Sequence, residues 1–382
     1  MLLCERHNFF FVMASDQKAA FRSAADFFEW FLCLTHDVTS LDVYRWLVRI
    51  ISRAVQRYPI TPVKVNTHKT VEHAESGAGG GPCSGIIRKF NSVVSNKLNK
   101  IVIFGVGLIG GSFSLALRKA NAVTEVVGFG RSEATLQQAQ QLGILDRIGR
   151  DVAAEVGDAD LVLLATPVGQ MAEIMARIAP HLGAHTLVTD GGSTKSDVVA
   201  AARANLGNRI AQFIPAHPIA GAEKSGASAA KPDLYVGKKV VLAPLPENSK
   251  DAVARVRKAW ELCGAVVSEL TPQQHDAVFA AVSHLPHLLS FALVHDLAQR
   301  DNRDLLLSFA ASGFRDFTRI AASSPEMWRD ICFANREALL QELQIYIAEL
   351  NQMSAALAAG DAARLEQTFR TARELRAGWK EQ

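Results

Sequence analysis

The sequence has few of the features that mark membrane or secreted proteins. No uninterrupted apolar run approaches the roughly 18–20 residues that a membrane-spanning helix needs, so we expect no membrane span. The five cysteines are scattered, without the spacing of a zinc site or a disulfide framework, which predicts reduced thiols and no bound metal. The N-terminus carries only a short apolar run, residues 9–14, with acidic residues nearby, and it matches a signal peptide poorly. We therefore expect a cytoplasmic protein.

A strong charge imbalance is missing as well. The formal net charge is +3 over 382 residues, and the basic surplus lies within the first hundred residues. From residue 100 onward acidic and basic residues nearly balance, so nothing electrostatic predicts a nucleic-acid partner. The composition, with 49% hydrophobic and 21% charged residues, is that of an ordinary soluble globular protein, and the length leaves room for two domains.

Residues 1–97 differ in character from the rest and are expected to form a poorly structured extension. Residues 77–85 (GAGGGPCSG) have the composition of a flexible linker. Upstream, a helix over residues 42–57 would carry a basic stripe suited to an anionic surface or a partner, made by Arg45, Arg49, Arg53 and Arg57. A solvated helix face or an unfolded segment explains the same pattern, and a natural start near Val93 is a further alternative. We assign this region no function.

Residues 100–112 (KIVIFGVGLIGGS) form the most informative stretch of the sequence. A run of β-forming residues meets Gly105, and a helical pattern follows from Ser112. In a strand–turn–helix context this is the dinucleotide-binding fingerprint: Gly105 allows the tight turn, Gly107 lets backbone N–H groups approach a diphosphate, and Gly110 permits close packing of helix on strand. Unpaired N–H groups and the helix dipole favour the anion there. The expected cofactor contacts are Gly105, Gly107, Leu108, Ile109 and Gly110.

Short apolar runs alternate with helical patterns up to residue 270. The runs, expected to be strands, cover residues 100–104, 125–129, 161–165, 185–190, 210–214, 239–243 and 265–270. The helical patterns cover residues 112–120, 133–142, 168–179, 195–205 and 249–262. Such alternation predicts an α/β fold in which a mainly parallel, doubly wound Rossmann sheet is covered by helices on both faces. We place this dinucleotide-binding domain at residues 98–270.

After Thr271 the strand signals stop and long helical patterns begin. Thr271 followed by Pro272 resembles a helix N-cap with proline in the first helical position. The patterns run to residue 299 and then over residues 302–312, 325–351 and 361–379. They predict an all-helical domain at residues 271–382. Its apolar surface needs a partner subunit as well as an intrachain core, so we expect a homodimer built on this domain.

The end of the second expected strand bears on the choice of cofactor. NAD sites usually place an Asp or Glu here to bind the ribose 2′-hydroxyl, whereas this chain has Gly130, Arg131 and Ser132. The missing carboxylate and the arginine favour NADP, with Arg131 and Ser132 at the 2′-phosphate. An arginine stacked on adenine or exposed on the loop would suit NAD equally, so NAD stays an alternative.

Further motifs stand where a Rossmann sheet and its covering helices place chemistry. They are LATP (164–167), DGGSTK (190–195), AHPIAGAEK (216–224), SHLPH (283–287), and GFRDFTR (313–319) followed by PEMWRD (325–330). Each alone has an ordinary structural explanation. Their joint order after GVGLIGGS closely resembles the prephenate/arogenate dehydrogenase family of tyrosine biosynthesis. The resemblance runs from about residue 100 to at least Asn335 and leaves out residues 1–99.

The resemblance implies oxidative decarboxylation of prephenate to 4-hydroxyphenylpyruvate, with hydride transfer to NAD(P). It implies that His217 is the base for the ring hydroxyl, that Ser193 hydrogen-bonds this hydroxyl and steers His217, and that Arg319 grips a substrate carboxylate. The other residues implied at the site are His287 and His284 on the substrate side, and Thr166 and Pro167 along the nicotinamide ribose. Arg315 stands four residues before Arg319, a spacing that puts both on the same face of a helix, and it is an alternative substrate-binding arginine, as is Arg329.

Three alternatives remain open. Arogenate, or both cyclohexadienyl substrates, would serve as well as prephenate, because no motif reads the side chain in which they differ. A 3-hydroxyacid or 6-phosphogluconate-type dehydrogenase shares the two-domain plan but relies on a helix lysine, where this chain has histidine motifs. A non-catalytic NADPH-sensing protein belongs to a different class, and the residues that argue against it are Ser193, His217, His287 and Arg319.

Overall fold

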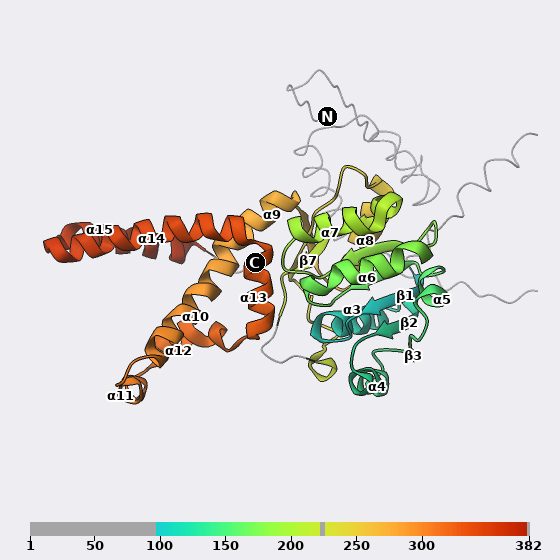
Figure 1. The fold of residues 1–382 in the computed structure, drawn as a ribbon, viewed down its shortest axis with the longest axis horizontal. Coiled ribbons are helices and arrows are strands. Elements are labelled where there is room, and N and C mark those ends of the chain that lie inside the picture. Colours follow the sequence, from blue (N-terminus) through green and yellow to red (C-terminus); the bar gives the residue numbers. More distant parts are fainter. Residues whose placement is uncertain (1–96, 222–225, 380–382) are drawn as a thin grey trace, which may run out of the picture. The chain divides into compact units, whose positions relative to one another are not determined.

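A computed structural model describes residues 97–221 and 226–379 of the chain (Figure 1). The arginine stripe at residues 45–57 and the linker at residues 77–85 lie outside the described residues. What was expected of them therefore stays a prediction.

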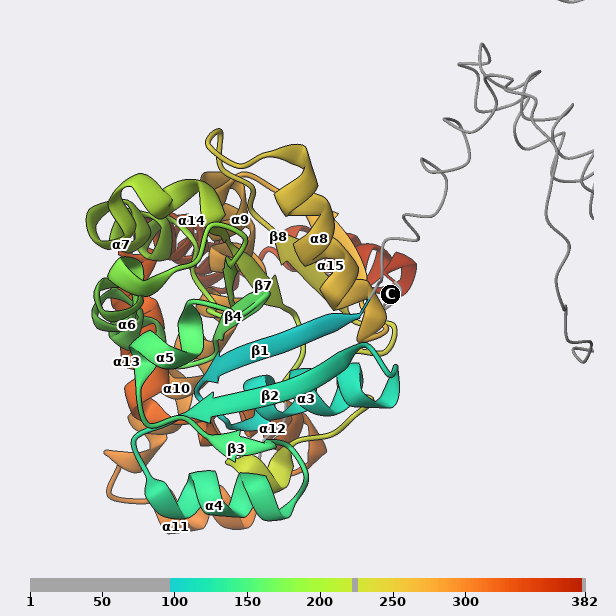
Figure 2. The same cartoon turned by 90° about the vertical axis from the view of Figure 1, so that its right-hand side faces the viewer.

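The first half of the described chain is built on a six-stranded sheet with the order β3-β2-β1-β4-β5-β6, part of which is seen in Figure 2. Its strands are β1 (Leu98–Phe104), β2 (Val123–Phe129), β3 (Arg147–Ile148), β4 (Leu161–Leu164), β5 (Leu187–Asp190) and β6 (Phe213–Ile214). Every neighbouring pair runs parallel. The strands are short and rich in Val, Ile and Leu because both faces of such a sheet are covered.

Helices cover this sheet on both faces. They are α3 (Leu108–Lys119), α4 (Glu133–Gln141), α5 (Val152–Val156), α6 (Met171–Ile178), α7 (Ser196–Leu206) and α8 (Lys250–Leu262), with the 3₁₀ turns η3 (Val168–Gln170), η4 (Ala179–His181), η5 (Gly207–Gln212) and η6 (Ala227–Ala229). Alternate residues of β1 face separate apolar cores. Ile101 and Ile103 share a core with residues of α3 and α8, and Val102 and Phe104 share one with residues of α6 and α7. The predicted doubly wound α/β fold is confirmed.

A second, three-stranded sheet was not expected. It has the order β7-β8-β9 and consists of β7 (Ala216–Pro218), β8 (Lys239–Leu242) and β9 (Val266–Glu269). Strand β8 pairs antiparallel with β7 and parallel with β9. The expectation that residues 239–243 and 265–270 join the main sheet is therefore wrong. Strand β7 gives no sequence signal because it has three residues and ends in proline.

The second half of the described chain is helical, as predicted. Its elements are α9 (Pro272–Phe279), the π-helical turn η7 (Ala280–His284), α10 (Leu285–Ala298), α11 (Arg303–Ser308), α12 (Ser312–Thr318), η8 (Arg319–Ala322), α13 (Pro325–Ala334), α14 (Arg336–Ala359) and α15 (Ala362–Gly378). The cap at its start is confirmed: Thr271 Oγ1 accepts the Gln274 N–H, and the Gln274 side chain accepts the Thr271 N–H.

Several helix boundaries differ from those expected. Helix α3 begins at Leu108 rather than Ser112, because two of the motif's glycines lie inside its first turn. The expected strand at residues 210–214 is mostly the turn η5, and the expected helix at residues 302–312 already ends at Ser308. The expected helix at residues 325–351 is divided at Asn335, whose side chain is used for hydrogen bonds to other elements.

Much of the helical half exposes apolar side chains. The continuous helix Pro272–Ala298 is long and apolar enough, by length and composition, to cross a membrane: an 18-residue window has a mean hydropathy of 1.7, with 28% of that window buried. It contains no long uninterrupted apolar run, because polar residues such as Asp276 and His284 interrupt its sequence. Both are buried and bond to neighbouring elements, as in a folded domain.

Candidate active site

The glycine loop between β1 and α3 has the geometry of a phosphate cradle. Gly105 has φ +93°, and a Cβ there would lie 2.5 Å from the Ala165 carbonyl oxygen. A Cβ on Gly110 would lie 2.3 Å from the Gly105 carbonyl oxygen, so helix and strand pack tightly. Around Gly107, the N-cap of α3, a Cβ would meet no atom within 4 Å, and no side chain caps the helix. The open space and the uncapped N–H groups fit a diphosphate.

The first turn of α3 is braced from outside the loop. The buried Tyr235 hydroxyl donates to the Ile109 carbonyl at 2.6 Å, and Ser112 Oγ accepts the Lys231 N–H at 2.9 Å. Leu108 and Ile109, both expected at the cofactor, lie in this turn. The rigid turn holds its N–H groups in place, which suits a preorganised anion site.

Thr166 and Pro167 follow β4 and lie next to the glycine loop. The methyl carbon of Thr166 is 3.0 Å from the Cβ position of Gly105. Its buried hydroxyl Oγ1 has no hydrogen-bond partner within the part of the chain that the structure describes. A buried hydroxyl without a partner is costly, and a ligand at the glycine loop would relieve that cost.

The loop after β2 holds the residues expected to choose between NAD and NADP. Arg131 is exposed. Ser132 Oγ accepts the Thr135 N–H at 3.3 Å as the N-cap of α4, which leaves its O–H free to donate. The carboxylate of the next residue, Glu133, is held by two bonds from Arg150, at 2.6 and 2.9 Å. The acid nearest in sequence is thus already paired.

Motifs that are far apart in the sequence lie close together at the carboxyl ends of the strands. A Cβ on Gly191, in the DGGSTK loop, would lie 3.0 Å from Ile109 of α3 and 3.8 Å from Pro218 of the HPIAG segment. A Cβ on Gly169, just after LATP, would lie 3.6 Å from Asp330 of the helical half. Segments far apart in the sequence therefore line one region, the place where open α/β sheets bind ligands.

His217 is the end of a hydrogen-bonded chain. Its Nδ1 lies 2.8 Å from Nε2 of His275, and Nδ1 of His275 lies 2.8 Å from Oδ1 of Asp276. The Asp276 carboxylate only accepts, so His275 carries its proton on Nδ1 and accepts at Nε2 from Nδ1–H of His217. This order leaves Nε2 of His217 unprotonated, which is the atom that a base needs.

The surroundings favour the neutral form of His217. Burial comes first, and the nearby His275, Lys195 and His284 add to it; together they hold the pKa of His217 well below its usual value. Its ring also packs against Phe279, with ring centres 4.8 Å apart. A neutral imidazole with a free Nε2 is prepared to take a proton at neutral pH.

The DGGSTK loop is closed by a buried ion pair. Lys195 Nζ bonds to Oδ2 of Asp190, and both side chains are fully buried. Asp190 also accepts the N–H groups of Gly192 at 2.8 Å and of Ala216 at 2.9 Å. Because Ala216 precedes His217, the same carboxylate that neutralises Lys195 holds the strand that carries His217.

Asp276 joins the helical half to the sheet half. Its Oδ1 accepts the Lys195 N–H at 2.8 Å, and its Oδ2 accepts the Ser196 N–H at 2.7 Å. These bonds and the one from His275 lower the pKa of Asp276 although burial opposes them. The sequence prediction missed both His275 and Asp276; the available signal was a His-Asp pair in the first helix after the capped Thr271.

Ser193 lies half-buried in the DGGSTK loop. No hydrogen bond joins its hydroxyl to His217 among residues 97–221 and 226–379; His217 is held by His275 instead. The role expected for Ser193, a bond to the substrate hydroxyl, stays a prediction.

Three residues of the helical half that were expected to bind the substrate lie near one another. His287 Nδ1 donates to the Ser283 carbonyl at 2.9 Å, and the ring stacks on Trp328 with centres 3.6 Å apart. Burial lowers the pKa of His287, and the charge of Arg319 also lowers it, so Arg319 lies close enough to act on the ring. His284 is buried, and its Nδ1 lies 3.0 Å from Nδ2 of Asn335.

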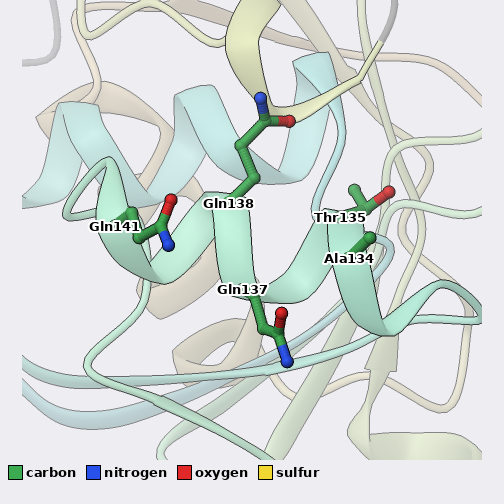
Figure 3. A pocket seen from close by; sticks show the side chains of 5 residues that line it. All are labelled: Ala134, Thr135, Gln137, Gln138 and Gln141. Atoms are coloured by element: carbon green, nitrogen blue, oxygen red, sulfur yellow. The ribbon is translucent and has the colours of Figure 1, made fainter.

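Arg315 does not join this group in the described chain. Its side chain is 78% exposed, and its partner is the adjacent Asp316, 3.7 Å away. A surface hollow also lies elsewhere: Figure 3 shows it along α4, lined by Ala134, Thr135, Gln137, Gln138 and Gln141. It contains none of the candidate site residues, and neutral amides on one helix give it no evident chemistry.

Comparison with known proteins decides the family. Two family models match in succession: "Prephenate dehydrogenase, nucleotide-binding domain" over residues 113–269, and "Prephenate dehydrogenase, dimerization domain" over residues 271–371. The prephenate dehydrogenase of Bacillus subtilis is 37% identical over 281 residues, which cover 73% of this chain and 75% of the relative. The chain belongs to the prephenate dehydrogenase family.

Other members of the prephenate dehydrogenase family agree in sequence and in fold. The cyclohexadienyl dehydrogenase of Zymomonas mobilis is 34% identical over 282 residues, covering 73% of this chain and 96% of the relative. The crystal structure of prephenate dehydrogenase from A. aeolicus in complex with hydroxyphenyl propionate and NAD⁺ shares 34% identity and has a TM-score of 0.69. That match covers 73% of this chain and 97% of the other.

Proposed function

We propose that this chain converts prephenate to 4-hydroxyphenylpyruvate and CO₂, with hydride transfer to NAD(P), in tyrosine biosynthesis. The observation that carries the proposal is the chain of hydrogen bonds from Asp276 through His275 to His217, which leaves a free acceptor on a neutral imidazole. Membership of the prephenate dehydrogenase family supports the substrate class. In this proposal residues 98–270 hold the nucleotide, and residues 271–382 supply the substrate side and the dimer contact.

In the proposed reaction, Nε2 of His217 takes the proton of the ring 4-hydroxyl while the C4–O bond gains carbonyl character. The Nδ1–H bond to His275, backed by the charge of Asp276, stabilises the imidazolium that forms. A bound nicotinamide supplies the acceptor for the hydride that leaves C4. When the ring carboxylate departs as CO₂, its electron pair completes the aromatic ring, and His217 returns the proton to the phenolate oxygen.

Cationic and neutral donors of the helical half are proposed to hold the two substrate carboxylates. The Arg319 guanidinium offers a bidentate grip, and His287 stands within reach of its charge. The Ser193 hydroxyl is proposed to hydrogen-bond the ring hydroxyl beside His217. Arg315 is exposed in this chain, and we propose it for the carboxylate only if Arg319 does not bind it.

For the cofactor, NADP is proposed as the preferred form, with NAD as the alternative. The exposed Arg131 at the end of β2 and the pairing of Glu133 with Arg150 support NADP, because no unpaired carboxylate of residues 130–133 faces a 2′-phosphate. The A. aeolicus relative was crystallised with NAD⁺, which favours NAD. Arg131 would then stack on adenine or remain in solvent.

We further propose a cytoplasmic homodimer. The name of the matching model for residues 271–371, a dimerization domain, supports the assembly. The exposed apolar side chains of the same helices support it independently. Nucleic acid and membrane partners are not part of the proposal.

Steady-state kinetics with two substrates and two cofactors test the proposal. We expect absorbance at 340 nm to rise when prephenate and NADP are both present. The second candidate is an arogenate or dual-substrate enzyme, which the cyclohexadienyl dehydrogenase relative favours; equal or higher kcat/KM with arogenate would select it. Binding of NADPH without turnover of either substrate would identify a sensor and overturn the proposal.

A further inference from the structure

Asn335 is a buried polar residue that the reaction as proposed does not use. It lies at the junction of α13 and α14 and is 5% exposed. Its Nδ2 donates to the Asp276 carbonyl at 2.8 Å and lies 3.0 Å from Nδ1 of His284. One amide group therefore contacts two residues of the candidate site, Asp276 and His284.

The two contacts determine where His284 carries its proton. The Asp276 carbonyl can only accept, so the amide nitrogen, not the amide oxygen, must face it. The same nitrogen lies against Nδ1 of His284 and donates its second proton there. Nδ1 is then an acceptor without a proton, and the neutral ring carries its proton on Nε2.

The Nε2–H of His284 is a buried donor that lacks a hydrogen-bond acceptor of normal geometry within the described residues. The ring is 1% exposed. The Ser193 backbone carbonyl lies near enough to act on the ring as a weak acceptor and raises its pKa slightly, but the contact falls outside normal hydrogen-bond geometry. A buried N–H beside Ser193 and His217 is therefore available to an oxygen atom that enters the site.

We infer that Asn335 is a positioning residue that holds His284 in the Nε2–H form, so that this N–H binds a carbonyl or carboxylate oxygen of a ligand next to Ser193. The ligand part of the inference rests on the proposed function. The tautomer part does not. Through its bond to the Asp276 carbonyl, Asn335 also keeps the helix turn that carries the His275–His217 chain in register.

The charged groups around His284 determine how a substitution at Asn335 should change the position of the proton on the ring. Burial lowers the pKa of His284 to about 4, with smaller effects from Asp276, His275 and His287. The titratable groups that face the ring from α9, α10 and β7 are Asp276, His275, His287 and His217. Since Asp276 is the one carboxylate among them, a second carboxylate at position 335 would strongly favour a proton on Nδ1.

Asn335→Asp is the decisive variant, because a carboxylate nearly matches the amide in shape but accepts where the amide donates. We expect kcat/KM for prephenate to fall at least tenfold near pH 7.5, and a new ionisation to enter its pH profile. Asn335→Gln keeps the donor on a longer arm and should recover part of the loss. Asn351→Asp, exposed on the same helix α14, is the matched control and should leave both unchanged.

The tautomer itself is measured by ¹⁵N NMR of the full chain labelled at histidine, with the His284 signals identified by their loss in His284→Gln. We expect a proton on Nε2 in the parent protein and on Nδ1 in Asn335→Asp. The NMR measurement needs no turnover, so it separates a failure of the inference from a failure of the proposed function.

A proton on Nδ1 of His284 in the parent protein would overturn the inference, even if Asn335→Asp did not fold. Unchanged kcat/KM and pH profile in a folded Asn335→Asp variant would overturn it as well. If the parent shows the Nε2–H form but turns over no cyclohexadienyl substrate, the tautomer part stands and the ligand part falls with the proposed function.

Discussion

At the scale of single residues, the site depends on where protons and charges are held. The buried pair of Lys195 and Asp190 brings a positive charge near His217 while keeping the pair neutral as a unit. Removing one partner would leave an uncompensated buried charge, which typically costs about 3–5 kcal/mol. Burial is the main cause that keeps His217 neutral, the charge of Lys195 adds to it, and Asp190 also fixes the strand of His217 through the Ala216 N–H.

His217→Asn tests the base directly. Because a general base acts in the transition state, we expect kcat to fall by about 10²–10⁴-fold while KM for prephenate changes little. The measurement is steady-state kinetics, with folding checked by circular dichroism. His295→Asn, an exposed histidine at the end of α10, serves as control. A kcat within a few-fold of the parent would remove His217 from this role.

The buried histidines also predict how stability depends on pH. Burial holds the pKa of His284 at about 4, well below its value in the unfolded chain. Between these two pKa values the unfolded chain binds the proton and the folded chain does not. The contribution of His284 to the free energy of unfolding is therefore fully present above about pH 6.5 and is lost as the pH falls toward the folded-state pKa. His217 and His275 shift in the same direction.

We therefore expect His284 to lower the free energy of unfolding by about 1.4 kcal/mol per pH unit between about pH 6.5 and pH 4, and His217 and His275 to add to this fall. Urea unfolding at pH 7.0, 6.0 and 5.0 measures the slope above the range where carboxylates titrate. His284→Gln should reduce it. A free energy of unfolding that stays constant over this range would contradict the burial of neutral histidines.

The family resemblance pointed to His217, Ser193 and His287, since each stands in a short string that belongs to the joint order of motifs. His275 and Asn335 had no such string. Their importance comes from contacts with residues 58 and 51 positions away, which only the folded chain creates. The contact between His275 and His217 was not foreseen for the same reason, and the role expected for Ser193 stays a prediction.

At the scale of elements, helix α7 shows how a local prediction can be right for incomplete reasons. The helical pattern was recognised, yet the residue before the helix, Lys195, provides no side-chain cap. The cap comes from Asp276 on α9, in the other half of the chain. Helix α7 and the site are therefore stabilised by the same contact between the two halves, which no local propensity encodes.

The glycine loop allows binding and folding to be separated by two matched substitutions. Gly107→Ala places a methyl group in open space at a negative φ, so the fold should tolerate it while the cofactor loses its approach to the backbone. Gly110→Ala places a methyl group 2.3 Å from a backbone oxygen. It should destabilise the fold by about 1–3 kcal/mol.

Thermal melting and titration with NADP and NAD distinguish the two variants. We expect Gly107→Ala to melt within a few degrees of the parent, since an unstrained substitution costs about 0.5 kcal/mol or less, and to bind both nucleotides at least tenfold more weakly. Gly110→Ala should melt distinctly lower. Normal nucleotide affinity in Gly107→Ala would place the diphosphate elsewhere.

At the scale of the whole molecule, the helical half leaves a large apolar surface that the described chain does not cover. Exposed side chains include Ile345 and Leu350 of α14, Phe309 after α11 and Phe369 of α15. The same property gives the helix Pro272–Ala298 the length and hydropathy of a membrane span. A second copy of the helical half would cover such a surface with apolar contacts, as homodimer interfaces do.

The double variant Ile345→Glu/Leu350→Glu tests this assembly. The two side chains are 65% and 45% exposed in the single chain, so carboxylates there should leave the fold of a monomer intact. In a dimer interface they would bury unpaired charge, which is strongly unfavourable. We expect sedimentation velocity at micromolar concentration to show a dimer for the parent and a monomer for the variant. Leu142→Glu, at a side chain that is 50% exposed after α4 in the nucleotide-binding half, should remain dimeric. A monomeric parent would refute the homodimer, and a dimeric double variant would move the interface away from this face of α14.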